Sequence, residues 1–195
     1  MNDILAPIFA IFLAETFNMN YIELENNLRK VEEEMTDENL LNAEADAFHC
    51  FSLFLSNMKQ NYIKGFDGVN ENLKKVRELL IKGDKELYTH LEENDIEVFH
   101  FGFRWCFCLL LREFPINLSI KLIDFYLTEE YSQDEFCVYL ILALLLRFSV
   151  KLKTLKREQI IMFLQNLPTS TWGDQDIQLL VSEAFALRNL LKLDN

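Results

Sequence analysis

Glycine and proline are scarce in this sequence, which has 5 glycines and 3 prolines in 195 residues. Strand-and-turn architectures and low-complexity chains need many such breaks, so the composition disfavours both classes. The hydrophobic fraction is 50%, which is enough to build a substantial core in a chain of this length. The composition therefore predicts an all-α fold without a significant sheet, forming one domain or a large piece of one.

Basic residues are also few, because 19 Lys and Arg face 31 Asp and Glu and leave a net charge of -12. Nucleic acids and anionic lipids both require a basic patch, so neither is a predicted partner. Much of the negative charge falls between Glu23 and Asp46. We expect this stretch to be a solvated loop and helix start that keeps the protein soluble, with an acidic docking surface as the alternative.

Metal-binding patterns are missing. None of the 4 cysteines has a Cys-x-x-Cys partner, and the 3 histidines are scattered. We therefore predict no metal and no cofactor, and we expect the cysteines to be small core residues in a reducing compartment. The cysteines are Cys50, Cys106, Cys108 and Cys137.

Long apolar runs are absent too. The uncharged run from Phe136 to Leu146 is well short of the roughly 20 residues that cross a bilayer. Asp3 precedes the apolar stretch Ile4–Leu13, where a signal peptide would carry positive charge. The sequence predicts a cytoplasmic protein without membrane insertion.

Catalytic motifs are not found: there is no Gly-rich phosphate loop, no Gly-x-Ser-x-Gly and no His-Glu-x-x-His. Cys106 or Cys108 with His100 nearby would be the nucleophile of an unrelated helical enzyme. Hydrophobic flanks raise the pKa of a thiol and leave it inert, so we assign no catalytic residue. The residues alone favour a helical binding or regulatory module.

Apolar residues recur at helical spacing along most of the chain, without an internal repeat. We expect breaks at Gly65–Gly68 and Gly83, a helix end at Pro115, and an N-cap at Asp174. The predicted helices are 2–17, 40–60, 69–82, 85–93, 96–114, 117–128, 134–149, 155–166 and 175–191.

Charged residues interrupt an otherwise apolar segment from Phe101 to Phe114, since Arg104, Arg112 and Glu113 lie between aromatic and aliphatic neighbours. A buried charge without a partner costs about 3–5 kcal/mol, so these groups must pair or reach an edge. Two explanations are open. Either the arginine stems pack while their heads stay in water, or the three residues pair inside the core.

The same segment resembles a signature of TBC-domain Rab GTPase-activating proteins, with Phe-x-Phe-Arg-Trp followed by Leu-Leu-x-Arg-Glu-Phe. Glu44–Cys50 similarly resembles the family's Glu-Ala-Asp-x-Phe-Trp-Cys helix, although His49 replaces Trp. Ile123 stands before Asp124 where the family usually has Trp. Four further segments match the family in the same order along the chain: 1–15, 61–65, 163–172 and 176–185. The last two of these resemble the subgroup of a Golgi-associated yeast Rab activator. The matched scaffold positions are Phe101, Phe103, Arg104, Trp105, Arg112, Glu113, Phe114 and Asp124.

The resemblance implies an all-helical fold in two lobes that contacts a Rab GTPase in its GTP form and regulates vesicle trafficking. In this family an arginine from Ile-x-x-Asp-x-x-Arg and a glutamine from Tyr-x-Gln-Gly stimulate GTP hydrolysis. Neither motif occurs here. Aligned to the family, Met1 follows the glutamine motif directly, so Asn2 and Asp3 are candidate partner contacts.

Residues 1–195 would then be a partial TBC domain, mainly the second lobe and the helix that joins the lobes, with the first lobe upstream of Met1. Three origins fit this start: an internal methionine taken as the initiator, a genuine short product, or a chain cut at this position. We expect the chain to be inactive alone, or to be a catalytically silent Rab-binding scaffold, located in the cytoplasm or peripherally at Golgi or other endomembranes. We also expect self-association, because the apolar helix 2–17 would be exposed without the first lobe.

Overall fold

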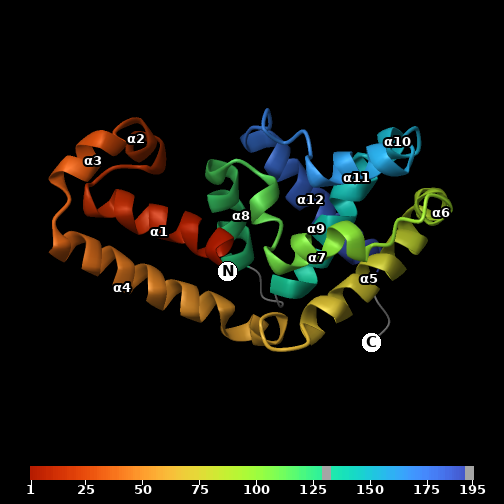
Figure 1. Ribbon diagram of the computed structural model, residues 1–195, viewed down its shortest axis with the longest axis horizontal. Coiled ribbons are helices and arrows are strands. Elements are labelled where there is room, and N and C mark those ends of the chain that lie inside the picture. Colours follow the sequence, from red (N-terminus) through yellow and green to blue (C-terminus); the bar gives the residue numbers. More distant parts are fainter. Residues whose placement is uncertain (129–132, 192–195) are drawn as a thin grey trace.

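The computed structural model describes residues 1–128 and 133–191, and every regular element in this part of the chain is a helix (Figure 1). The predicted all-α class is therefore confirmed. The α-helices are α1 (Asn2–Thr16), α2 (Tyr21–Asn26), α3 (Leu28–Glu34), α4 (Asp37–Phe54), α5 (Asp67–Gly83), α6 (Lys85–Glu93), α7 (Phe99–Phe107), α8 (Ile116–Thr128), α9 (Gln133–Arg147), α10 (Ser149–Leu152), α11 (Arg157–Gln165) and α12 (Asp174–Leu190). Two 3-10 helices are η1 (Leu55–Asn61) and η2 (Leu111–Glu113).

The helices form a long arm and a compact body (Figure 1). In the arm, α1 runs outward and α4 runs back beside it, with α2 and α3 at the tip. In the body, α5, α7 and α12 pack around α9, whose residues Phe136–Leu145 are all buried. The uncharged run that is too short for a bilayer is thus the central core helix.

The arm carries a small hydrophobic cluster of its own, distinct from the main core. Ala14, Leu24 and Val31 form this cluster, while Ile4 and Ile8 of the same first helix belong to the main core. The helix α1 is consequently less exposed than predicted: its large apolar side chains are buried or half-buried between α4, α8 and the tip. The strongly exposed large apolar side chains of the arm lie on α2, α3 and α4 instead, for example Ile22, Leu28 and Phe48.

The predicted helix 96–114 is wrong, because α7 ends at Phe107. Leu109 and Leu110 follow with φ of 51° and 59°, a conformation that is costly for a branched residue. Both side chains are fully buried, and the Leu110 N–H bonds the Trp105 carbonyl at 2.8 Å. Burial of these side chains offsets the strained turn, which no helical periodicity reveals. Pro115 accordingly lies directly before α8, where its carbonyl accepts from the Leu118 and Ser119 N–H groups, rather than ending the preceding helix.

The loop expected after Glu23 is also wrong, since α2 and α3 occupy this stretch, whereas the helix start expected before Asp46 is confirmed by α4, which begins at Asp37. N-terminal capping residues mark the starts of two of these helices. Asn20 and Glu23 form a capping box at α2, and the Thr36 hydroxyl accepts from the Asn39 N–H at 3.2 Å at the start of α4. The N-cap of α12 is Gly173 rather than Asp174. The break at Gly83 is confirmed, because α5 ends at that residue.

At Gly68, in the first turn of α5, close packing and helix propensity favour different residues. A Cβ there would overlap the Asn61 side-chain oxygen and lie 3.2 Å from the Asn61 backbone nitrogen. Asn61 is fully buried and donates to Asp134 at 2.6 Å. Alanine favours a helix over glycine by about 1 kcal/mol. Because the added methyl group would overlap Asn61, we nevertheless expect Gly68→Ala to lower the free energy of unfolding by about 1–3 kcal/mol.

Urea unfolding measures this effect. The matched control is Gly173→Ala, where a Cβ meets nothing within 4 Å. We expect that variant to lose less stability than Gly68→Ala, namely the roughly 0.5–1 kcal/mol that alanine costs at an N-cap. Equal stability of the two variants would show that the Asn61 region yields to the extra methyl group.

Candidate functional site

An ion pair organises the segment that carries the family-like signature. The Arg104 Nη2 donates to Glu113 Oε2 at 2.8 Å and to the Leu164 and Gln165 carbonyls at 3.4 and 3.2 Å. The Glu113 side chain is 4% exposed and that of Arg104 is 34% exposed. One guanidinium therefore joins α7, η2 and α11, as expected for pairing inside the core.

The surroundings of Glu113 serve structure rather than reaction. Burial raises the pKa of this carboxyl above its ordinary value of 4.5, and Arg104 and the Trp105 indole lower the pKa in part. The Thr169 hydroxyl donates to the Glu113 backbone carbonyl. Each polar contact ties η2 to a neighbouring element, and none presents a reactive group to solvent.

Arg112 behaves differently from Arg104, and pairing inside the core, the second of the two explanations, does not hold for this residue. It is exposed and has no ion-pair partner among residues 1–128 and 133–191. The turn at Leu109–Leu110 explains the difference, because η2 places Arg112 outward and Glu113 inward. The snorkelling explanation fits Arg112 better.

The other signature residues are mainly packing groups. The Phe101 and Trp105 rings lie 4.9 Å apart, Phe103 stacks on Phe107 at 5.8 Å, and Phe114 contacts Trp172 at 5.6 Å. Asp124 lies exposed on α8, where partial burial raises its pKa and Lys121 offsets this rise. These contacts position helices of the body.

The residues proposed for partner contact lie at the start of α1. Asn2 is exposed, and Asp3 is half-buried with its carboxylate accepting from the Cys108 thiol at 3.7 Å. Burial, and then Asp3, raise the pKa of Cys108 to about 11. Burial likewise raises the pKa of Cys106 and that of Cys137, the latter to about 12. These thiols are therefore poor nucleophiles at neutral pH.

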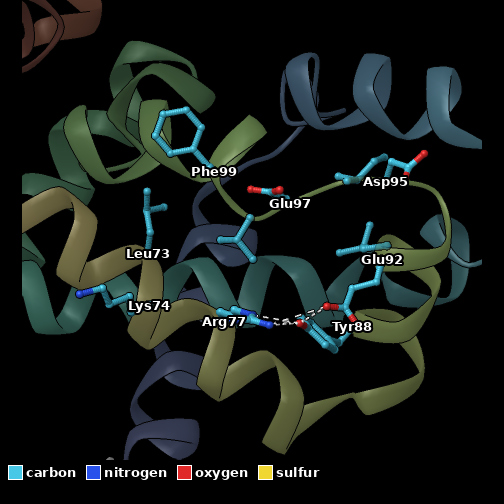
Figure 2. Close-up of a pocket in the computed structure, with 11 residues that line it drawn as sticks. Leu73, Lys74, Arg77, Tyr88, Glu92, Asp95, Glu97 and Phe99 are labelled. Carbon is cyan, nitrogen blue, oxygen red and sulfur yellow. Dashed lines mark hydrogen bonds and ion pairs between the residues drawn. The ribbon is translucent and has the colours of Figure 1, made fainter.

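A cavity of about 540 Å³ lies between α5, α6 and the segment that leads into α7 (Figure 2). Arg77 donates through Nε and Nη2 to the Tyr88 hydroxyl at 2.9 and 2.7 Å, and Tyr88 donates to Glu92. Sequence reasoning missed this site, because its residues come from three elements and match no motif. One indication of the site was present in the sequence: Tyr88 and Glu92 are four residues apart and so lie on the same face of a helix.

The cavity is suited to binding rather than catalysis. Arg77, Tyr88 and Glu92 bond one another, and no histidine, serine or cysteine is among the residues that line the cavity. In the described part of the chain, no group of three or more His, Cys, Asp or Glu side chains is placed to hold a metal ion. Similarly, none of the helices in residues 1–128 and 133–191 combines the length and apolarity needed to span a bilayer.

Comparison with known proteins defines the class to which this helical arrangement belongs. Residues 1–153 match the model of the Rab-GTPase-TBC domain. The chain therefore belongs to the TBC-domain family.

Individual relatives agree over nearly the whole chain. The sequence is 34% identical to human TBC1 domain family member 22A over 189 residues and 32% identical to the GTPase-activating protein gyp1 of Schizosaccharomyces pombe over 191 residues. These matches cover 96% and 97% of this chain but 36% of each relative, so the chain spans little more than a third of their length. The crystal structure of the Ypt/Rab-GAP domain of Gyp1p superposes with a TM-score of 0.88 at 35% identity, covering 98% of this chain and 59% of that one.

Proposed function

We propose that this chain is part of a Rab GTPase-activating TBC domain and that it binds a Rab GTPase in its GTP form, thereby regulating vesicle trafficking. The observation that carries the proposal is the likeness to the Gyp1p Ypt/Rab-GAP domain over 98% of the chain. A relative described as a GTPase-activating protein supports it. The chain would act in the cytoplasm, peripherally at Golgi or other endomembranes through its Rab.

The catalytic groups would come from outside residues 1–195. The sequence contains neither Ile-x-x-Asp-x-x-Arg nor Tyr-x-Gln-Gly. Arg104 and Glu113 form a structural ion pair with each other. Residues 1–195 would be a partial TBC domain that supplies helical scaffold and Rab contacts. Asn2 and Asp3, at the start of α1, are the residues we propose to lie nearest the bound Rab.

A GTP hydrolysis assay tests this function directly. We expect the 195-residue chain to leave the single-turnover rate of every member of a Rab panel unchanged, because arginine fingers contribute roughly 10³–10⁵ to the rate. The Gyp1p Ypt/Rab-GAP domain is the positive control. Acceleration by this chain alone would contradict the assignment of the catalytic groups to other residues.

A binding measurement then separates the activator from an unrelated helical protein. We expect at least one Rab loaded with a non-hydrolysable GTP analogue to bind more tightly than its GDP form. Asn2→Ala should weaken that complex, while Val150→Ala, on the exposed surface of α10, should not. Failure of the whole panel to bind would overturn the proposal.

A catalytically silent Rab-binding scaffold is the second candidate, and the missing finger motifs favour it. Joining this chain to a finger-containing first lobe of the Gyp1p domain distinguishes the two functions. Restored GTP hydrolysis supports an activator scaffold. Rab binding with no gain in hydrolysis supports the silent protein.

Self-association is a further expected property of the isolated chain. Leu41, Phe48 and Leu53 of α4 are 65%, 69% and 62% exposed on the arm. Exposed apolar groups gathered on one element favour association in water. Sedimentation velocity should show a concentration-dependent increase in mass, which Phe48→Glu reduces and Val150→Glu does not. A monodisperse monomer at high concentration would refute this expectation.

A further inference from the structure

The cavity between α5 and α6 opens to the surface above a floor of nearly buried apolar side chains. Leu73, Leu91, Ile96 and Val98 line it and are 7%, 2%, 3% and 8% exposed. Phe99 stands at one end of the opening and is 54% exposed (Figure 2). The cavity has a volume of about 540 Å³, which falls within the range of specific ligand sites and accommodates one or two large side chains.

The rim of the cavity has an excess of negative charge. Its cations already have protein partners: Lys74 contacts Glu71 at 2.7 Å, and Arg77 bonds Tyr88 and lies 3.7 Å from Glu92. Among the rim carboxylates, Asp95 lies 3.2 Å from Arg157.

Glu97 is the rim carboxylate that remains available. It is exposed and has no ion-pair partner in the described residues 1–128 and 133–191. In Figure 2 it lies across the opening from the Arg77, Tyr88 and Glu92 network. The unused charge of the site is therefore negative and sits beside an apolar floor.

The walls of the cavity are fixed before any ligand binds. The bonds from Arg77 to Tyr88 join α5 to α6, and Arg157 holds the Asn94 and Asp95 carbonyls at 2.9 and 2.8 Å. These contacts hold two sides of the opening in place. A preformed site needs less ordering on binding, which favours affinity for a short flexible ligand.

We propose that this cavity binds a short peptide segment of a partner protein, with a leucine or phenylalanine on the apolar floor and an adjacent lysine or arginine facing Glu97. Phosphorylated or acidic segments do not suit it, because both rim cations are occupied. The chain charge of -12 also favours approach of a basic segment. This site goes beyond the proposed Rab contact and would recruit a second protein.

Fluorescence anisotropy of the full 195-residue chain with three labelled peptides tests the proposal. The first peptide has a Lys-Leu-Phe-Lys core in a Gly-Ser background. The second replaces both lysines with glutamate, and the third replaces Leu and Phe with serine. We expect the first to bind at least about tenfold more tightly than either of the others, since both the charge and the buried apolar area contribute.

Variants of the chain then locate the site. Glu97→Lys and Phe99→Ser, both at exposed positions, should each weaken binding of the first peptide about tenfold or more. Glu93→Lys makes the same charge change on the exposed surface of α6 outside the cavity, and it should leave affinity within about twofold because solvent and salt screen a charge that does not contact the peptide. No binding of the first peptide, equal binding of the acidic peptide, or equal loss with Glu93→Lys would overturn the proposal.

Discussion

Replacing Arg104 with alanine is expected to lower the free energy of unfolding by about 3–5 kcal/mol. The change removes the 2.8 Å contact to Glu113 and leaves that carboxylate, 4% exposed, without its cation. The contacts to the Leu164 and Gln165 carbonyls disappear as well. For a chain of this length the midpoint of thermal unfolding should fall by about 10 °C.

The adjacent arginine of the signature provides the control. Arg112 is exposed, so Arg112→Ala should change stability by no more than about 0.5 kcal/mol. Equal losses in the two variants would mean that charge alone, and not the buried pair, stabilises the segment.

The pH dependence gives a second measurement on the same variant. Burial already raises the pKa of Glu113 above 4.5 in the folded protein, and removing Arg104 removes an influence that lowers it. In the variant, the Glu113 carboxyl of the folded state therefore stays protonated over a wider pH range above 4.5, whereas the same carboxyl of the unfolded state has already lost its proton. The free energy of unfolding of the variant consequently decreases as pH rises through that range. Arg104→Ala should therefore recover part of its lost stability on mild acidification, and Arg104→Ala with Glu113→Gln should lose this dependence.

Trp105→Ala should cost about 3–5 kcal/mol, the range found for removal of a large buried aromatic side chain. Trp105 is fully buried, packs against Phe101 and provides an indole that lowers the pKa of Glu113. The variant would lose this packing together with an influence that lowers the pKa of a buried carboxyl group. Guanidinium unfolding followed by circular dichroism measures the loss.

The second of the 2 tryptophans is the matched control. Trp172 is half-buried, with the Arg147 guanidinium 5.1 Å from its ring centroid. Trp172→Ala should cost less, about 1–2 kcal/mol, because part of its area stays in water. A larger loss at Trp172 than at Trp105 would place the main packing centre near α12 instead of α7.

Local sequence predicted the helices of the body well where burial is one-sided. The helix expected over 85–93 has those bounds in the structure, and the one expected over 69–82 is α5 with small extensions. The prediction failed after Phe107, where two fully buried leucines adopt positive φ. Tertiary packing decides that turn, and helical periodicity contains no information about it.

The site was predictable only in part. The resemblance of the signature led to the family, but the different environments of Arg104 and Arg112 depend on the turn between them. The cavity depends on residues from α5, α6 and the segment before α7, which only the folded chain brings together. Sequence order identified the class of protein, whereas the binding surface had to be read from the structure.

The separate hydrophobic cluster at the arm tip has a consequence for how this domain tolerates change. Ala14, Leu24 and Val31 pack apart from the main core, so opening of the tip has a free energy set mainly by these few contacts. Substitutions or insertions in α2 and α3 would therefore unfold the tip locally while α9 and its neighbours remain packed. Changes at the tip should accordingly disturb the main core less than changes in the body do.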